Sequence, residues 1–271
     1  MHHDTMTASP IRSIAPSPVV ELLNVSRRWR PGILGAAPAV DALRGVTLQL
    51  FPGELVALTG AAGAGKSALL LLATGEVAPT SGVVRWGDRE EPSAVRPQRI
   101  GPRPWEYPSL TVRQALVFHA DQLRRHGASR RPPARYQPLL RRVGLQGRAR
   151  TPLGALSALG AFRVVVAQAL LARPALLCCD EPFAYCGPKE RVEAVRLLRR
   201  LAGTGIAVLI ATREGDGLVT RPEIDRSVAL VHGRIVPSGR ARRTRLPLPL
   251  PGLEVRPPRR RARVAEDAPP V

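Results

Sequence analysis

The sequence predicts an α/β fold built around a mostly parallel sheet, and three observations point to it. Short apolar runs have the length and composition of buried strands, and helical patterns separate them. The apolar runs are residues 54–59, 176–180 and 206–211, and the helical patterns are residues 66–74, 162–171 and 190–201. A glycine-rich segment joins the first strand to its helix. Strands that alternate with helices in this way pair in parallel, because each helix carries the chain back to the same edge.

The first and last segments of the chain differ in composition from the part between them. Residues 1–18 are polar and proline-containing, so we expect a disordered lead. Arginine and proline dominate residues 240–271, and proline removes hydrogen-bond donors and fixes φ, so we expect a disordered tail. The folded domain is therefore placed at residues 19–239. Its closing element is a predicted hairpin at residues 227–236 with its turn at His232.

The chain is strongly basic, with a formal net charge of +20 and a pI near 11.6. Only two of its basic residues, Lys66 and Lys189, are lysines. We interpret the arginine excess as the drift of a GC-rich genome that leaves a solvated basic surface. A membrane-surface role and nucleic-acid binding remain alternatives, although no specific nucleic-acid partner is expected. No apolar run approaches the roughly 18 residues of a membrane span, and the N-terminus lacks a secretory pattern, so the expected compartment is the cytoplasm.

A phosphate-binding motif is the central chemical feature of the sequence. The pattern GxxxxGK(S/T) is matched without a gap by Gly60-Ala61-Ala62-Gly63-Ala64-Gly65-Lys66-Ser67. Glycines let backbone N–H groups curl around phosphate oxygens, and the helix that follows directs its positive end at them. We expect Lys66 to reach the β- and γ-phosphates and the Ser67 hydroxyl to bind magnesium. The sequence therefore predicts binding of a nucleoside triphosphate, ATP with Mg²⁺.

Two carboxylates follow the second predicted strand. Asp180 ends the apolar run and can hold Mg²⁺ through water, while Glu181 can polarise the attacking water. The strand also carries adjacent cysteines, Cys178 and Cys179, which point to opposite faces. We therefore predict buried packing for these cysteines and neither a disulfide nor a metal cage.

With these motifs the chain resembles the ATP-binding cassette (ABC) nucleotide-binding subunits over residues 19–239. The segment Leu156-Ser157-Ala158-Leu159-Gly160 stands where that family has its LSGGQ signature. Trp29 stands where an aromatic residue of the opening strand stacks on adenine. The resemblance implies a P-loop NTPase of the ABC nucleotide-binding type. In that fold an antiparallel β part and a small helical subdomain, at about residues 111–155, accompany the parallel core sheet.

The resemblance also implies how such a subunit works. Two ATP-binding subunits dimerise head to tail, and each ATP lies between the phosphate loop of one subunit and the signature of the other. Ser157 would then contact the nucleotide held by a second ATP-binding subunit, which is either an identical copy or a different chain. The implied transmembrane part is a separate permease chain. The subunit would sit peripherally at the inner face of the cell membrane through that partner.

Several family positions are altered in this chain. Ala158 and Leu159 replace two glycines of the signature, and we expect the leucine side chain to crowd the approach to the γ-phosphate. Arg213 replaces the switch histidine; it can clamp a phosphate but cannot copy a neutral imidazole. The remaining altered positions are Gly187, in place of an aspartate, and Pro102 or Arg103, in place of the Q-loop glutamine.

Three functions are compatible with this pattern. The leading hypothesis is an ATP-binding subunit that energises or regulates a membrane transporter, with slow hydrolysis in its own site. Glu181 and Arg213 are its candidate catalytic residues. The alternatives are a non-transport ABC ATPase acting on nucleic acid or ribosomes, and a regulatory pseudo-ATPase that binds ATP without turnover.

Overall fold

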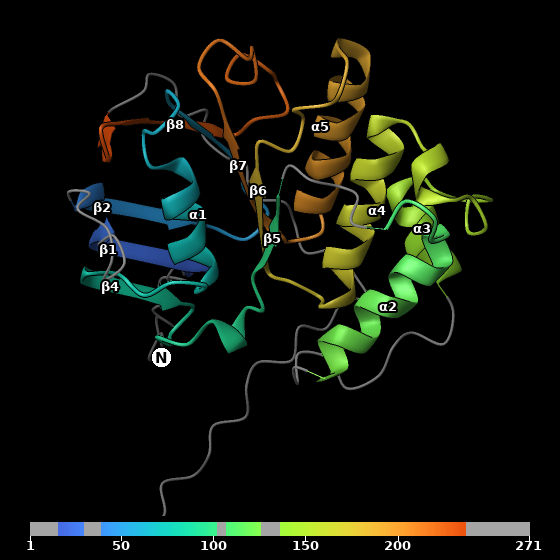
Figure 1. Ribbon diagram of the computed structural model, residues 1–271. Coiled ribbons are helices and arrows are strands. Elements are labelled where there is room, and N and C mark those ends of the chain that lie inside the picture. Colours follow the sequence, from blue (N-terminus) through green and yellow to red (C-terminus); the bar gives the residue numbers. More distant parts are fainter. Residues whose placement is uncertain (1–15, 30–38, 102–106, 126–135, 237–271) are drawn as a thin grey trace, which may run out of the picture.

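The structure is a computed structural model that describes residues 16–29, 39–101, 107–125 and 136–236. Within these ranges the chain forms two β-sheets and five α-helices (Figure 1). Residues 240–271 and most of the predicted lead lie outside the described residues, as does the Q-loop position at Pro102 and Arg103. The domain boundaries therefore stay predictions.

The strands form one antiparallel and one mostly parallel sheet. The smaller, antiparallel sheet has the strand order β2-β1-β4 and consists of β1 (Val20–Trp29), β2 (Val40–Leu50) and β4 (Ser81–Trp86). The larger sheet has the order β5-β6-β7-β3-β8-β9. Its strands are β3 (Leu55–Thr59), β5 (Gln98–Ile100), β6 (Leu176–Asp180), β7 (Ala207–Thr212), β8 (Arg226–Val231) and β9 (Arg234–Val236). Neighbours in the larger sheet are parallel except β8 and β9, which form an antiparallel hairpin.

The helices lie on both faces of the larger sheet. Helix α1 (Lys66–Thr74) packs between the two sheets, and α4 (Ala158–Leu171) and α5 (Pro188–Ala202) cover the opposite face (Figure 1). Helices α2 (Val112–Arg125) and α3 (Gln137–Val143) pack on α4 and form the helical part of the domain. Short 3-10 turns occur at Pro92–Ala94 and Leu153–Ala155. In the described segments, every helix is too short or too polar to cross a bilayer.

Successive residues of the buried strands alternate between two hydrophobic cores. Cys178 packs in the core that contains α1 and the smaller sheet, whereas Cys179 packs in the core that contains α4 and α5. This is the period-two alternation of a strand that is covered on both faces. Both thiols are fully buried, and burial raises the pKa of each well above its ordinary value. The prediction that these cysteines pack in the buried core is confirmed.

The predicted fold class is confirmed, and most element bounds agree closely. The helix predicted at 66–74 is α1, and the strand predicted at 176–180 is β6. The predicted hairpin is β8–β9, and its turn residues His232 and Gly233 have φ values of 45° and 75°. Two consecutive positive φ values are typical of the type I′ turn that matches strand twist. The largest difference is at α4, which begins four residues before the predicted helix at 162–171 because Ser157 caps it.

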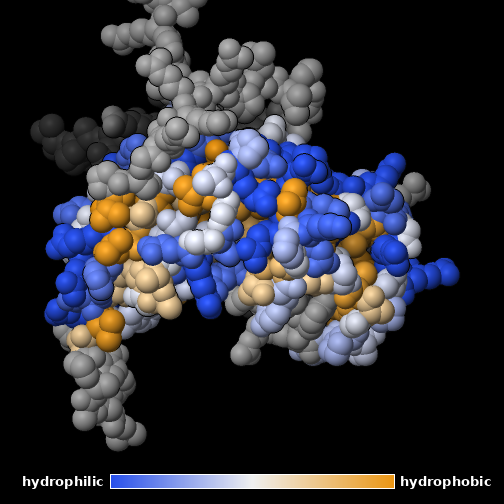
Figure 2. All heavy atoms as spheres, turned by 90° about the horizontal axis from the view of Figure 1, so that it is seen from above, coloured by the Kyte–Doolittle hydropathy of each residue, from blue (hydrophilic) through white to orange (hydrophobic). Residues whose placement is uncertain are grey.

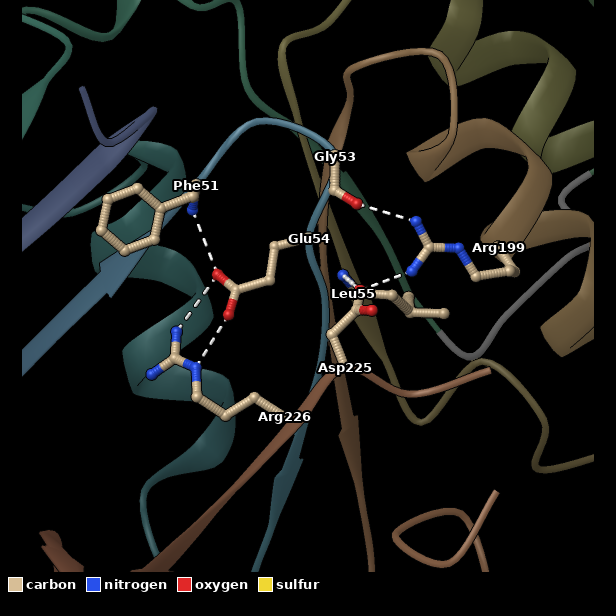
Figure 3. A network of polar contacts seen from close by, with 7 residues as sticks. All are labelled: Phe51, Gly53, Glu54, Leu55, Arg199, Asp225 and Arg226. Carbon is tan, nitrogen blue, oxygen red and sulfur yellow. Dashed lines mark hydrogen bonds and ion pairs between the residues drawn. The ribbon is translucent and has the colours of Figure 1, made fainter. Parts of the chain in front are cut away.

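A polar network fixes the amino ends of β3 and β8 (Figure 3). Arg226 donates through Nε to Glu54 Oε1 at 2.8 Å, and Glu54 is only 5% exposed. Arg199 of α5 forms an ion pair with Asp225, which also accepts the Leu55 N–H at 2.8 Å. The network lies at the start of β3, so it is at the opposite end of the strand from the glycine-rich loop.

Candidate nucleotide-binding site

The phosphate loop joins β3 to α1 and is seated by close backbone contacts at two glycines. A Cβ at Gly60 would lie 2.4 Å from the Leu230 carbonyl oxygen of β8, and a Cβ at Gly65 would lie 2.2 Å from the Ala42 carbonyl oxygen of β2. Gly65 also has a φ of 104°, which side-chain-bearing residues rarely adopt. Ala64, next to Gly65, is buried. Glycine is therefore required at both positions, where the loop touches one strand of each sheet.

The tip of the loop is open, and its lysine is turned inward. Ala61, Ala62 and Gly63 are exposed, whereas Lys66 is 6% exposed. The Lys66 Nζ donates to the carbonyl oxygens of Gly60 at 2.7 Å and Ala61 at 2.9 Å. These are its acceptors among the described residues, and an ammonium group has three N–H donors. One N–H of Lys66 thus has no acceptor among the described residues.

The two candidate magnesium ligands lie at the same sheet edge. Ser67 is exposed in the first turn of α1, and Asp180 ends β6. Asp180 pairs with Ala211 of β7, whose next residue pairs with Thr59 at the end of β3. The carboxyl ends of these parallel strands point to the top in Figure 1, the side seen in Figure 2, where hydrophilic residues alternate with small apolar patches. A hydroxyl and a carboxylate are hard oxygen donors and fit Mg²⁺ that also binds phosphate oxygens and water.

The two candidate catalytic side chains contact each other. Glu181 has a φ of 43°, which is uncommon for a residue with a side chain, and its N–H donates to the Ala211 carbonyl at 3.0 Å. Its Oε1 lies 3.3 Å from Arg213 Nε, and its Oε2 lies 3.3 Å from Arg213 Nη2. The Arg213 side chain is 70% exposed. Both oxygens of the Glu181 carboxylate therefore face a permanent cation in a solvent-accessible pair.

Trp29 lies one strand away from the phosphate loop. It ends β1 and pairs with Val40 of β2, and Ala42 of the same strand touches the loop at Gly65. Strand spacing and rise put the backbone of Trp29 roughly 8 Å from Ala42. Trp29 is 37% exposed. This position suits a ring that stacks on a base whose phosphates occupy the loop.

The altered signature forms the start of α4. The Ser157 Oγ accepts the Gly160 N–H at 3.2 Å and so caps the helix. Leu159 is only 6% exposed and belongs to the same core as Phe162. The prediction that the Leu159 side chain crowds a phosphate is therefore wrong, because this side chain points into the core. Of the two residues that replace the signature glycines, Ala158 is the one that stays partly exposed at this helix end.

Glu190, absent from the predicted site residues, links the start of α4 to the start of α5. Its Oε1 accepts the Leu159 N–H at 3.3 Å, and its Oε2 accepts the Gly187 N–H at 3.2 Å. The Ser157 hydroxyl has the largest effect on Glu190 and lowers its pKa below the ordinary value; desolvation opposes this, and the two N–H groups add to the lowering. Glu190 is the third helical residue after Gly187, which is the capping-box position. The three-residue spacing from Gly187 to Glu190 is the feature of the sequence from which this capping role could have been predicted.

Replacing Glu190 by alanine is expected to loosen the start of α4. A lost capping carboxylate costs about 1 kcal/mol, which corresponds to roughly fivefold faster exchange of the Leu159 and Gly187 amides. Hydrogen exchange followed by mass spectrometry or NMR measures this effect. The matched control is Glu193→Ala, which removes a carboxylate paired with Arg163 one turn further along α5. Unchanged exchange at both amides would show that Glu190 does not cap this end.

Comparison with known proteins identifies the family of the chain. The family model described as ABC transporter matches residues 43–184. The chain belongs to the ABC transporter family. It is 36% identical over 217 residues to the aliphatic sulfonates import ATP-binding protein SsuB 1 of Xanthomonas axonopodis pv. citri (strain 306), with 77% of this chain and 82% of the relative covered. It is 34% identical over 235 residues to the lipoprotein-releasing system ATP-binding protein LolD 1 of Rhodospirillum rubrum, with 82% and 99% covered.

A solved ABC cassette has the same fold. The dimeric, post-hydrolysis structure of the ATP-binding cassette MJ0796 bound to ADP and Pi superposes with a TM-score of 0.64. The superposition covers 82% of this chain and 99% of that chain at 24% sequence identity. The family match includes the phosphate loop, the altered signature and Asp180-Glu181, whereas Trp29 and Arg213 lie outside the matched residues.

Proposed function

We propose that this chain is the ATP-binding subunit that energises or regulates a membrane ABC transporter whose transmembrane part is a separate chain. One observation carries the proposal: an uninterrupted phosphate loop lies at the same sheet edge as Asp180 and Glu181. The relatives support it, since SsuB 1 is an import ATP-binding protein and LolD 1 is the ATP-binding protein of a lipoprotein-releasing system. Such a subunit would sit at the inner face of the cell membrane through its permease.

ATP and Mg²⁺ would be held by groups from both sheets. The N–H groups of the exposed residues at the loop tip would cradle phosphate oxygens, with the remaining N–H of Lys66 directed at one of them. Ser67 and Asp180 would hold Mg²⁺, which neutralises charge on the phosphates. Trp29 would stack on the adenine.

Slow hydrolysis is the finer part of the proposal, and the Glu181–Arg213 pair supports it. Glu181 can polarise a water only if its carboxylate accepts a hydrogen bond from that water. The Arg213 guanidinium, 3.3 Å away, competes with the water for the same oxygens. The pair is exposed, so its strength is modest, on the order of 1 kcal/mol or less. Arg213 could also bind a γ-phosphate, which would free Glu181 but leave a cation in place of an imidazole. Turnover is therefore expected to be reduced but not abolished.

Two surfaces fit the expected partners. Ser157, which is exposed at the start of α4, lies on the segment that in the implied head-to-tail dimer faces a second ATP-binding subunit. The rings of Tyr107 and Phe118 pack edge to face with centroids 5.8 Å apart, yet both residues are about half exposed. This aromatic pair, formed by Phe118 of α2 and by Tyr107 just before the helix, is exposed to solvent and suits an apolar contact with the permease.

The regulatory pseudo-ATPase remains a second candidate, because the Glu181–Arg213 pair would also account for a site with no turnover at all. Steady-state ATP hydrolysis distinguishes the two candidates, since only the slow ATPase would show turnover. An ABC ATPase that acts on nucleic acid or ribosomes is the remaining alternative, and sequence- or structure-selective binding would favour it. Salt-sensitive binding alone would not, since any protein with a net charge of +20 should show it.

Steady-state ATP hydrolysis by the purified chain tests the proposal. We expect turnover well below about 1 per second, the lower end of ordinary enzyme rates, because Arg213 occupies the Glu181 carboxylate. Replacing Arg213 by histidine should raise turnover about threefold to tenfold, since it releases Glu181 and restores an imidazole. Glu181→Gln removes the carboxylate and serves as the control for hydrolysis that does not depend on Glu181. Turnover of about 1 per second or more by the natural chain would contradict slow hydrolysis while leaving ATP binding intact.

A further inference from the structure

Arg27 covers one face of the Trp29 ring. Its guanidinium carbon lies 4.1 Å from the ring centroid, and its Nη1 donates to the Ala78 carbonyl oxygen at 2.8 Å. The Arg27 Nε is buried and has no hydrogen-bond partner among the described residues. The side chain is therefore fixed between the loop before β4 and the indole.

We infer that Arg27 is a positioning residue for nucleotide binding: it holds the Trp29 ring so that the adenine stacks on the opposite face. An indole has two faces, and the guanidinium occupies one of them at cation–π distance. Trp29 nevertheless keeps 37% of its surface exposed, which leaves ring surface for a base. The inference rests on the proposed placement of adenine at Trp29 and adds a residue to it.

The physical role of Arg27 is to reduce the ordering that binding requires. An exposed tryptophan at a strand end can turn about two side-chain torsions, and a ligand that stacks on it must stop that motion. A guanidinium anchored on a backbone carbonyl stops it beforehand. The cation is also planar, so it covers the ring face more fully than an ammonium would.

Calorimetric titration of the full chain with Mg-ATP and with Mg-tripolyphosphate tests this inference. Tripolyphosphate has no base, so it reports on the phosphate loop alone. Trp29→Ala should weaken ATP binding about tenfold, and Arg27→Ala about threefold to fivefold. Both should leave tripolyphosphate binding within about twofold. Arg27→Gln, which keeps most of the stem, should fall between Arg27→Ala and the natural chain.

The matched control is Arg28→Ala, which removes the same charge from the next residue. Arg28 pairs with Asp41 across the strands, with Nε 2.5 Å from Oδ1, and does not stack on the ring. Its ATP affinity should stay within about twofold. Equal effects of the two arginine substitutions, equal losses for both ligands, or tighter ATP binding by Arg27→Ala would each overturn the inference. If Trp29→Ala leaves ATP affinity unchanged, the adenine position itself is wrong and the inference falls with it.

Discussion

Replacing Lys66 by alanine is expected to weaken ATP–Mg binding by about 3 kcal/mol, or roughly 150-fold. The reason is that Lys66 is buried and already oriented, with two of its donors on the carbonyls of Gly60 and Ala61. A bound phosphate therefore gains a charged donor without having to order a long side chain. Truncation removes that donor and the positive charge that it brings to the phosphate. Titration calorimetry with Mg-ATP measures the loss.

The control for charge is unusually clean in this chain. Lys189 is the other lysine of the sequence, and it is exposed near the start of α5. Lys189→Ala changes the net charge by the same amount and should change ATP affinity less than about threefold. A third variant, Lys66→Arg, keeps the charge but cannot reproduce the compact ammonium between two carbonyls, so its affinity should be intermediate. If Lys66→Ala binds ATP within about threefold of the natural chain, the phosphate loop does not bind nucleotide as proposed.

The sequence was sufficient for the backbone of this fold because local patterns and tertiary packing agree there. The β3–loop–α1 unit follows from an apolar run, a glycine pattern and a leucine-rich helix, each readable within a few residues. The adjacent cysteines illustrate the same point, since strand geometry alone sends Cys178 and Cys179 to different cores. Elements of this kind need no knowledge of distant neighbours.

Side-chain direction at the altered signature could not be predicted in the same way. Leu159 was expected at the surface by its place in the motif, but the start of α4 turns it into the core beside Phe162. The contacts of Glu190 and Arg27 join elements that are distant in the chain, so no local pattern gives their geometry. Glu190 at least occupies a recognisable capping position. Arg27 precedes Trp29 by two residues, which puts both side chains on one face of β1, but the sequence does not show that the guanidinium stacks on the ring and reaches Ala78.

Replacing Arg226 by alanine is expected to lower the free energy of unfolding by about 3 kcal/mol. Glu54 is 5% exposed and receives two of its contacts from Arg226, at 2.8 and 3.2 Å (Figure 3). Without Arg226 the Glu54 carboxylate keeps the Phe51 N–H, at 3.1 Å, but loses its compensating charge. Because Arg226 is itself 28% exposed, the expected loss is at the lower end for a buried ion pair. Thermal unfolding should show a fall in Tm of about 6–12 °C.

A second substitution separates the buried charge from the lost arginine packing. Glu54→Gln in the Arg226→Ala background removes the unpaired charge, so the double variant should be more stable than Arg226→Ala alone. The control Arg234→Ala removes an exposed arginine from β9 and should change stability by less than about 0.5 kcal/mol. The network lies at the amino end of β3, away from the phosphate loop, so folded Arg226→Ala should bind ATP with unchanged affinity. A loss of ATP affinity in the folded variant would instead mean that β3 transmits the position of its first residues to the loop. In that case the network and the nucleotide site would act as one unit.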